Sequence, residues 1–597
     1  MRYQHIVIWI CLTGWGWGFL SAEKIHSVDE WIDVLGYDAE TSVSEEDLIS
    51  AQQIIATPVT FNAARSILTS ISILSLTDIE IINSSKNIHV LKTNRDLSPA
   101  AEYLVQSIQT VDQLPISLSV RERISFNNGV RHYWRAQGRS RSYHFGILLE
   151  KDPWEKNIAD HNSIYVQWNS ENVQMITGDH QLIGGYGLIS WRTVAAHKGF
   201  ETINTLPRHG KGITGYRSSN EYWCTRGIGG EWKTDYGQVS FSLGRTYRDG
   251  TLENGAVKLD ITGQHITASD LHQQNQLLEN AATVMWSRDL QFGRLGLLVN
   301  TQNIEDPSKK QVNAASASMF GSKQWNNWHI FGESAFIKHT TPALFSGALF
   351  KSKALKYLVS WRYYPTDYRT YRTQSFSEWT SSAAGETGIF QNVQVKYGKN
   401  KLSIYSDLAE KIEENNPVVY NNLKSETGIR WRWQSKKHHF LVQYKKSNQS
   451  EENQTFYPDI TAYDSYKITT KGLYKYKPTR KLDLRWQINS TLYNDNQKGL
   501  GFETRMNWQT PSLIITGNWI AAKIDDFNSR VYFWELNLPG EMNSVAISED
   551  KQLVGVKIQI KSKKNYQMYM RWRAVWNNLS FIGTPEQRSA LALQIIF

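Results

Sequence analysis

Arginines recur at every second position in several short stretches of the chain. In "IRWRWQ", Arg430 and Arg432 alternate with tryptophans, and in "MYMRWRAVW", Arg571 and Arg573 do the same. On an extended strand, alternate side chains point to the same face. Rows of guanidinium groups bind carboxylates and phosphates and favour anions in pores. The spacing therefore predicts anion binding or anion passage along one face of a sheet.

Other candidate chemistry lacks the residue sets that it needs. His180, His197 and His209 occur close together, but their spacing matches no compact metal-binding motif. The "HGKG" around Lys211 has threonine, not glycine, at position 205, where a phosphate-binding loop needs glycine. The histidines have no nucleophile motif nearby. We therefore predict a protein that is not an enzyme and has no metal or cofactor.

The stretches that carry the arginines alternate between apolar and polar residues. In "KLDLRWQINSTLY", leucines, Trp486 and Ile488 oppose Arg485 and Gln487, and in "LVGVKIQIK", valines and isoleucines oppose Lys557 and Gln559. This pattern predicts half-buried antiparallel strands of about ten residues. It continues from about residue 116 to the end of the chain.

The alternatives for this region are a soluble sandwich or propeller and a membrane barrel. We find no blade-like repeat, and the region is longer than one sandwich. Short connectors such as "YGKNK" and "YKPTRK" contrast with long polar ones such as residues 447–465. The 23 Trp and 29 Tyr suit a membrane interface, although the mean hydropathy is −0.47. We predict a mainly β fold, with a transmembrane antiparallel barrel over residues 115–597 and an even strand number in the low-to-mid twenties.

Closing the sheet would turn its apolar face to lipid and its polar face to a lumen. The formal charge of +10 favours anionic partners. Acidic residues such as Asp483, Glu503 and Glu426 would pair with some of the lumen-facing bases. The lumen-facing basic candidates are Arg121, Arg123, Arg131, Arg135, Arg430, Arg432, Arg485, Arg505, Lys557, Arg571 and Arg573.

The last strand ends on an aromatic residue. In "RSALALQIIF", Leu591, Leu593, Ile595 and Phe597 form one apolar face. This ending resembles the sorting signal read by the machinery that inserts outer-membrane barrels. It implies contact with outer-membrane lipid and lipopolysaccharide in a Gram-negative-type bacterium.

The first 22 residues have the form of a secretory signal peptide. Arg2 precedes an apolar run from Ile6 to Leu20, and the small residues Ser21 and Ala22 follow. The alternative is a membrane anchor, but the run is short for a helical span. After cleavage only Cys224 remains, so the mature chain would have no internal disulfide.

Residues 23–114 have a different pattern. Stretches such as "SEEDLISAQQIIA" and "SPAAEYLVQSIQTV" have helical periodicity and few aromatic residues. We predict a small helical domain facing the periplasm. A long irregular segment, about 193–220, follows the glycines at 178, 184, 185 and 187. It is either a loop folded over or into the barrel or a mobile surface loop.

Three stretches resemble bacterial outer-membrane proteins that have an N-terminal helix-hairpin-helix segment before a large barrel. The stretches are "PVTFNAARSILTSISILSLTDIEII" (58–82), "GDHQLIGGYGLISW" with "KGITGYRSSNEYWCTRGIG" (178–191 and 211–229), and "VYFWELNLPG" (531–540). The resemblance implies an outer-membrane location and this fold, but no defined activity.

The helix-hairpin-helix segment is similar to the DNA-binding part of competence receptors, where a hairpin glycine lets backbone N–H groups approach a phosphate. Here the hairpin "SISILS" (70–75) has no glycine. Lys86, Lys92 and Arg95 remain as candidate phosphate contacts. The alternatives are a plug and a docking domain for a periplasmic partner.

Two function classes follow. The first is a transport or conduit barrel with a basic lumen that favours anionic material, closed or docked by the helical domain. The second is a permanently plugged binding or structural barrel, including a DNA-uptake or adhesion component.

Overall fold

A computed structural model gives the fold of most of the chain. The predicted signal peptide (1–22) and Phe597 lie outside the described residues. The structure describes residues 28–596 except for 36–44, 57–58, 95, 112–116, 127–128, 141, 156, 158, 192–197, 254–255, 262, 292, 338–341, 369, 372, 374, 379–383, 413–422, 450–464, 480, 542 and 562–565.

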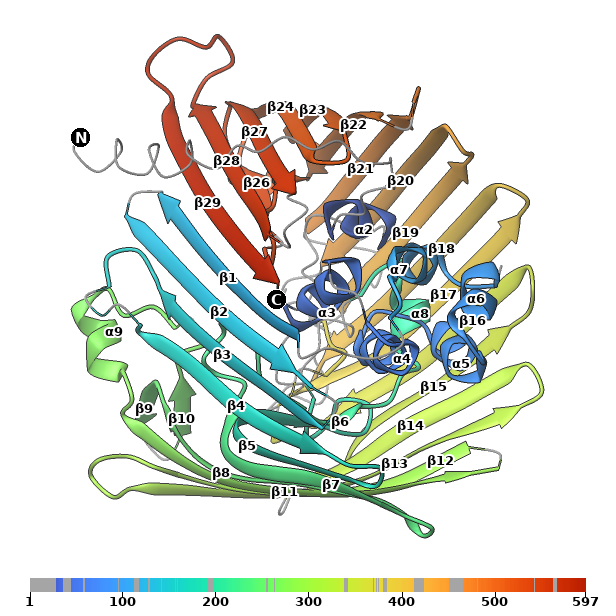
Figure 1. The fold of residues 1–597 in the computed structure, drawn as a ribbon, viewed down its shortest axis with the longest axis vertical. Helices are drawn as coiled ribbons and strands as arrows, with labels where there is room; N and C mark the ends of the chain where they lie inside the picture. The colour runs from blue at the N-terminus through green and yellow to red at the C-terminus, as the bar shows by residue number, and fades with distance from the viewer. Residues whose placement is uncertain are drawn as a thin grey trace, which may run out of the picture.

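A single antiparallel sheet forms the wall of a barrel (Figure 1). Of the 25 strands assigned to this sheet, the short β6 (Gly212–Gly215) pairs only with β5, and the other 24 form the wall in the described part of the chain. The wall strands are β1 (Ser117–Phe126), β2 (Val130–Arg139), β3 (Tyr143–Lys151), β4 (His161–Asn169), β5 (Val173–Ile183), β7 (Thr225–Thr234), β8 (Gly237–Arg248), β11 (Leu277–Leu290), β12 (Gly293–Glu305), β13 (Gln311–Trp325), β14 (Trp328–Ile337), β15 (Ala343–Lys351), β16 (Leu355–Tyr364), β17 (Glu386–Tyr397), β18 (Asn400–Lys411), β19 (Leu423–Gln434), β20 (His438–Gln449), β21 (Ser465–Tyr476), β22 (Leu482–Tyr493), β23 (Gln497–Gln509), β24 (Leu513–Ile524), β27 (Lys551–Lys561), β28 (Tyr566–Trp576) and β29 (Glu586–Ile596).

The first and last strands close the barrel. β1 pairs with β2 on one side and with β29 on the other, where Val120 lies opposite Ile595 and Ile124 opposite Leu591. Each wall strand is antiparallel to its neighbours, so the sheet has no free edge. The even strand number in the low-to-mid twenties is confirmed.

Apolar side chains cover the outside of the wall and polar ones fill much of the inside. On β12, Leu297 and Val299 are 51% and 52% exposed. Leu298 and Asn300, which alternate with them, are 0% and 6% exposed. On β29, Leu593 faces outward while Ala592 and Gln594 are buried. A closed barrel satisfies its backbone hydrogen bonds internally, and an apolar outer surface matches lipid. The chain is therefore an outer-membrane barrel of the Gram-negative type.

The two ends of the barrel differ in their connections. At one end, pairs such as β7–β8, β13–β14 and β17–β18 are joined by two residues. At the other end lie the longer segments 249–276, 365–385 and 525–550. Short turns mark the periplasmic end of such barrels and long loops the outer end. None of the helices in the described residues has the length and apolar composition needed to cross a bilayer.

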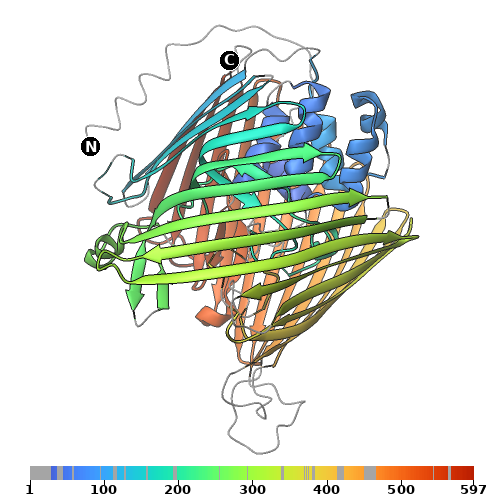
Figure 2. The same ribbon diagram turned by 90° about the horizontal axis from the view of Figure 1, so that it is seen from below.

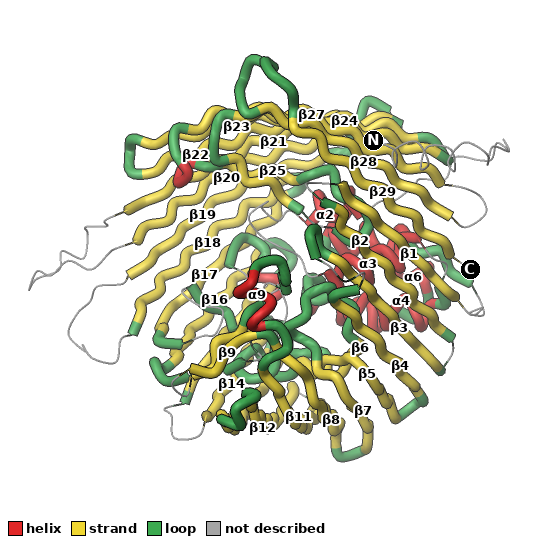
Figure 3. Tube along the Cα trace, turned by 90° about the vertical axis from the view of Figure 1, so that its left-hand side faces the viewer, coloured by secondary structure: helices red, strands yellow, loops and turns green. Residues whose placement is uncertain are grey.

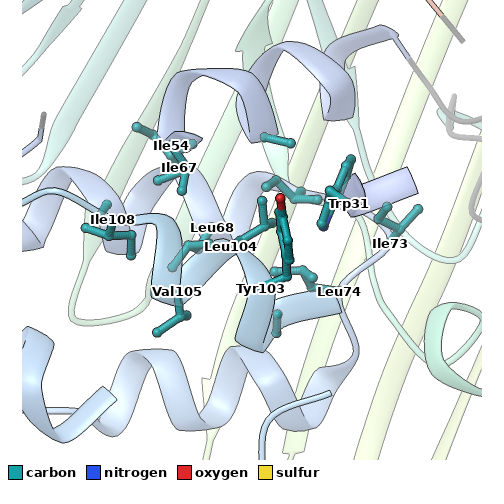
Figure 4. Packing of buried hydrophobic residues seen from close by; sticks show 14 of the residues in the cluster. Trp31, Ile54, Ile67, Leu68, Ile73, Leu74, Tyr103, Leu104, Val105 and Ile108 are labelled. Carbon is teal, nitrogen blue, oxygen red and sulfur yellow. The ribbon is translucent and has the colours of Figure 1, made fainter. Parts of the chain in front are cut away.

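A bundle of short helices lies at the short-turn end, against the inside of the wall (Figures 1 and 2). Its helices pack around one apolar core, which includes Trp31, Ile54, Leu68 and Leu104 (Figure 4). The helices are α2 (Val28–Leu35), α3 (Glu45–Ala56), α4 (Phe61–Ser70), α5 (Leu76–Ser84), α6 (Ile88–Thr93) and α7 (Pro99–Ser107). We refer to α2–α7 as the helical domain.

Side-chain caps fix where these helices begin. The Ser75 hydroxyl accepts a hydrogen bond from the Asp78 N–H, and the Asp78 carboxylate accepts one from the Ser75 N–H, which is a capping box. The same carboxylate accepts hydrogen bonds from the Ser98 N–H and hydroxyl at the start of α7. Asp78 is fully buried and links the starts of α5 and α7.

Three segments from the outer end fold into the barrel instead of staying outside. Residues 184–224, which we call the inner segment, include α8 (Thr202–Thr205) and β6. Its Tyr186, Leu188 and Phe200 pack with inward-facing wall residues such as Phe331 and Phe390. Residues 365–385 join this cluster through Tyr368 and Phe376.

The third segment is residues 525–550, which we call the strap. It contains η2 (Phe527–Ser529), β25 (Val531–Trp534) and β26 (Ser544–Ile547) and packs on β24 and β27. Outside the lumen, β9 (Gly250–Glu253), β10 (Ala256–Leu259) and α9 (Ala268–Gln273) form an outer projection (Figures 1 and 3). The described parts of the three inward-folded segments therefore fill much of the lumen.

Candidate functional site: a basic cavity beside the helical domain

The inner segment supports the helical domain through cationic side chains. Arg208 donates hydrogen bonds to the backbone carbonyls of Thr69 (3.2 Å) and Ile71 (2.5 Å). The Lys211 Nζ donates to the carbonyl of Ser70 at 3.1 Å. These carbonyls end α4, where a helix leaves acceptors unpaired and favours positive charge. Arg208 and Lys211 therefore fasten the α4–α5 turn.

The wall holds the other side of the helical domain. The Gln52 Nε2 of α3 donates to the Gln594 Oε1 of β29 at 2.7 Å, and Arg121 of β1 donates to the side chains of both glutamines. Arg217 of the inner segment donates to the Ser50 hydroxyl at 3.2 Å. The domain is thus joined to the wall and the inner segment by polar contacts, and to the strap by Trp534, which packs in the domain's apolar core.

A cavity of about 630 Å³ lies between these contacts. Its walls come from α3, α4 and α5 on one side and from β1–β5, β7, β11, β12 and the inner segment on the other. Among the described residues that line it, Asp289 is the one acidic residue. The basic residues that line it are Arg139, Arg208, Lys211, Arg217, Lys233 and Arg294.

The positive charge affects a histidine in the cavity wall. The Arg294 Nη1 donates to the imidazole of His209 at 3.0 Å, and the His209 Nδ1 lies 2.7 Å from the Gly210 carbonyl oxygen. Burial and the neighbouring Arg294 lower the pKa of His209 to about 4. The imidazole is therefore neutral at neutral pH, and the cavity's charge comes from arginine and lysine.

Most of the predicted lumen-facing bases are buried and contact segments inside the barrel. Arg123 and Arg571 lie 3.5 and 2.6 Å from the Glu541 carboxylate, and Arg573 pairs with Glu535, both in the strap. Lys557 and Arg505 donate to strap carbonyls, those of Asn537 and Trp534.

The others are distributed between the inner segment and the wall. Arg430 and Arg432 lie 3.5 and 3.7 Å from Glu201, which precedes α8. Arg135 donates to the Arg217 carbonyl, and Arg485 lies 3.6 Å from Glu503 on the adjacent strand. Arg131 is half-exposed and pairs with Asp152 at the outer end.

Acidic pH should release the strap. Burial alone would raise the pKa of Glu541, but Arg123, Arg571 and the Leu538 N–H hold it below its ordinary value. A depressed folded-state pKa gives stability that is present above the ordinary glutamate pKa of about 4.3 and is lost as the pH falls through the folded value. We expect Glu541→Gln to cost roughly 1–3 kcal/mol at pH 7 and to reduce the loss of stability in acid.

Urea unfolding followed by gel mobility of unboiled samples, at pH 7 and below pH 4, measures this effect. Glu586→Gln, which removes one carboxylate of the exposed pair with Arg588, is the matched control. If wild type and Glu541→Gln lose the same stability between the two pH values, Glu541 does not hold the strap.

The candidate phosphate contacts of the helical domain are not gathered on one surface. Lys86 is exposed, the Lys92 Nζ donates to the Ile108 carbonyl at 2.8 Å, and Arg95 lies outside the described residues. Residues 71–75 of the hairpin are buried, and its carbonyls face Arg208 and Lys211.

Sequence reasoning missed most of the cavity's basic residues. Arg139 and Lys233 stand at strand ends, where the alternation stops, and Arg208 and Arg217 lie in the inner segment, which has none. The cluster "RHGKG" was the one available signal, since it places Arg208 and Lys211 beside two glycines. Only the fold shows that both contact the helical domain.

Comparisons with known proteins leave the function open. No protein-family model and no curated protein matches the chain. Solved structures to which it is similar include the ferric enterobactin receptor PfeA (9% identity, 82% of each chain, TM-score 0.39), the siderophore receptor PirA from Pseudomonas aeruginosa (10%, 82% of this chain and 80% of that one, 0.39) and the copper transporter OprC (6%, 81% and 80%, 0.40). TM-scores this low do not establish a common fold, so the function has to be inferred from this chain's own geometry.

Proposed function

We propose that this protein is a gated transport barrel of the outer membrane that passes anionic material, with the helical domain as its periplasmic gate. The observation that carries the proposal is the basic cavity between the helical domain and the wall. A movement of the domain away from the wall would join this cavity to the periplasm. A transported solute would thus bind at the gate itself.

The size and charge of the cavity indicate the kind of solute. A volume of about 630 Å³ suits a small organic molecule rather than a single inorganic ion. Six arginines and lysines face one aspartate among the described lining residues. Guanidinium groups bind carboxylates and phosphates in two-point contacts. We therefore favour a solute with several carboxylate or phosphate groups.

Gating requires contacts that can break. The helical domain has its own caps and an apolar core that Trp534 and Tyr532 of the strap join, and polar side chains make several of its other contacts with the barrel. A folded unit that is fastened mainly by side-chain contacts, including those of Trp534, can move as a body without unfolding. Glu80, Lys86 and Val90 lie on its exposed face, which is where a periplasmic partner would act.

A second candidate is a barrel that is permanently plugged and serves for binding or structure. Buried polar contacts favour it: Arg362, Glu386 and Asp407 pair with one another on the wall strands β16–β18 with almost no exposure, and Glu386 accepts a hydrogen bond from the N–H of Glu378 in residues 365–385. The hydrogen bond to Glu386 holds residues 365–385, which enter the barrel from its outer end, and none of these contacts involves the helical domain. The two candidates therefore differ in whether the periplasmic end opens.

Binding of an anionic probe tests the proposed solute class. We expect the reconstituted protein to bind a pyrene trisulfonate dye in a salt-sensitive way. Arg139→Gln and Arg217→Gln should each weaken binding about tenfold to a hundredfold, because each removes a charge-assisted contact. Fluorescence titration at two salt concentrations measures the affinity.

Lys258→Gln with Arg588→Gln is the matched control, since it removes two positive charges at exposed positions outside the cavity. Its affinity for the dye should equal that of the wild type. Equal affinity for the dye in the wild type and in the Arg139→Gln variant would show that the cavity does not select anions.

A further inference from the structure

Three segments meet at the outer end of the barrel around a buried histidine. His265 lies between β10 and α9 and is 6% exposed. Asp160 comes from the segment between β3 and β4, Asp249 directly follows β8, and Glu221 comes from the end of the inner segment. None of these side chains belongs to the basic cavity, which lies at the opposite end.

The two ring nitrogens of His265 face different carboxylates. The Nδ1 contacts Asp160, and the Nε2 lies 2.9 Å from the Asp249 Oδ2. One carboxylate oxygen each of Asp249 and Glu221 and a nitrogen of His265 all lie within 4.8 Å of one another. The side chains of His265 and Asp160 are 4% and 5% exposed, and that of Asp249 is 10% exposed.

The carboxylates of this group are not neutralised by lysine or arginine. Among the described residues, the ion pairs of Asp160, Asp249 and Glu221 involve histidines alone. The Glu221 carboxylate accepts no hydrogen bond from any described residue, and its nearest cation is His161 at 3.7 Å. A carboxylate turned towards another carboxylate without a donor is unfavourable unless a cation binds between them.

We propose that His265 Nε2, Asp249 and Glu221 bind a divalent transition-metal ion such as Zn²⁺. One imidazole with two carboxylates is a common ligand set for such ions and leaves a further position for water. Asp160 does not bind the ion but accepts the Nδ1–H hydrogen bond, which fixes the ring and directs Nε2 to the metal. On binding, the ion takes the place of the Nε2 proton, which passes to solvent.

An ion at this site would link the outer projection to the inner segment. Asp249 and His265 belong to the outer projection, and Glu221 belongs to the inner segment, which continues into the barrel. An ion shared by them would join the cell-surface loops to the filling of the lumen. Because Glu221 is 25% exposed at its side chain, the ion can enter from outside.

Zinc titration of the mature full-length protein in detergent tests the site. After treatment with a chelator, calorimetry and elemental analysis should show one Zn²⁺ per chain. H265Q, D249N and E221Q should each weaken binding at least tenfold, and D160N should weaken it tenfold to a hundredfold without changing the stoichiometry. H132Q is the control, because His132 also pairs with a carboxylate, that of Glu122 at 3.1 Å, but belongs to no group of metal-ligating side chains among the described residues.

E221Q decides the question if H265Q does not fold, because among the described residues the Glu221 carboxylate has no hydrogen bond to lose, and its one ion pair is that with His161 at 3.7 Å. Gel mobility before and after boiling shows whether each variant is a folded barrel. Zinc affinity that is the same in wild type and E221Q would overturn the proposal. Binding of Ca²⁺ alone, unchanged in H265Q, would also overturn it, since the imidazole would then have no role.

Discussion

Replacing Arg208 and Lys211 together with alanine should convert a closed barrel into a conducting one. The two side chains make three hydrogen bonds to the carbonyls of Thr69, Ser70 and Ile71 at the end of α4. Hydrogen bonds that involve a charged group contribute about 1.5–3 kcal/mol each. Losing the three hydrogen bonds should therefore shift the closed-to-open equilibrium by roughly a thousandfold to a millionfold.

Planar-bilayer recording of the purified protein measures this change. The wild type should be silent or open rarely, and the double variant should show long openings. Lys233→Ala is the matched control, because Lys233 also lines the cavity, and no contact between it and the helical domain is described. A double variant that folds but stays as silent as the wild type would mean that these contacts do not hold the gate.

Replacing Arg362 with methionine should cost about 3–5 kcal/mol of barrel stability. The Arg362 guanidinium lies 2.5 Å from the Glu386 carboxylate and 2.8 Å from that of Asp407. All three side chains are 2% exposed or less. Without the arginine, the buried carboxylates lose their nearest cation: Glu386 keeps the Glu378 N–H, and Asp407 keeps Lys198 at 3.8 Å. Removing one partner of a buried ion pair costs more than the pair itself contributes.

Urea unfolding of reconstituted protein gives the change in the free energy of unfolding. Arg588→Met breaks the exposed pair with Glu586 and should change stability by less than about 0.5 kcal/mol. Arg362→Lys keeps the charge but loses the two-point geometry. Its loss of stability should therefore be smaller than that of Arg362→Met and larger than that of Arg588→Met. A midpoint for Arg362→Met equal to that of wild type would show that the three residues do not stabilise the filled barrel.

The wall of the barrel was predictable because its strands follow a local rule. Alternate residues on a strand face lipid and lumen, so sequences such as the one around Leu297 and Leu298 show their two faces directly. The helical domain was equally predictable, because stretches such as "SEEDLISAQQIIA" have helical periodicity, and this one forms α3. In both cases the signal lies within a few consecutive residues.

The filling of the barrel and the roles of the arginines were not predictable in this way. The partner of Arg123 is Glu541, and the partner of Gln52 is Gln594, each hundreds of residues away in the sequence. The face that should line an open lumen instead binds the inner segment, the strap and the helical domain. The histidine cluster was missed for the same reason, since His265 and its carboxylates come from three separate loops.

The most direct measurement of the gate is conductance with the helical domain tethered to the wall. Glu80 of α5 and Lys351 at the end of β15 form an ion pair at 3.7 Å, and both are accessible. We would introduce E80C and K351C into the R208A/K211A protein, with Cys224 replaced by serine, and join them with a short bismaleimide. E253C with K258C is the control, because it cross-links the outer β9–β10 hairpin within itself.

If the helical domain is the gate, the tether across residues 80 and 351 abolishes the conductance of the R208A/K211A protein, and the control cross-link leaves it unchanged. If the conductance persists with the domain tethered, the path does not run past the helical domain, and the proposed gate is wrong.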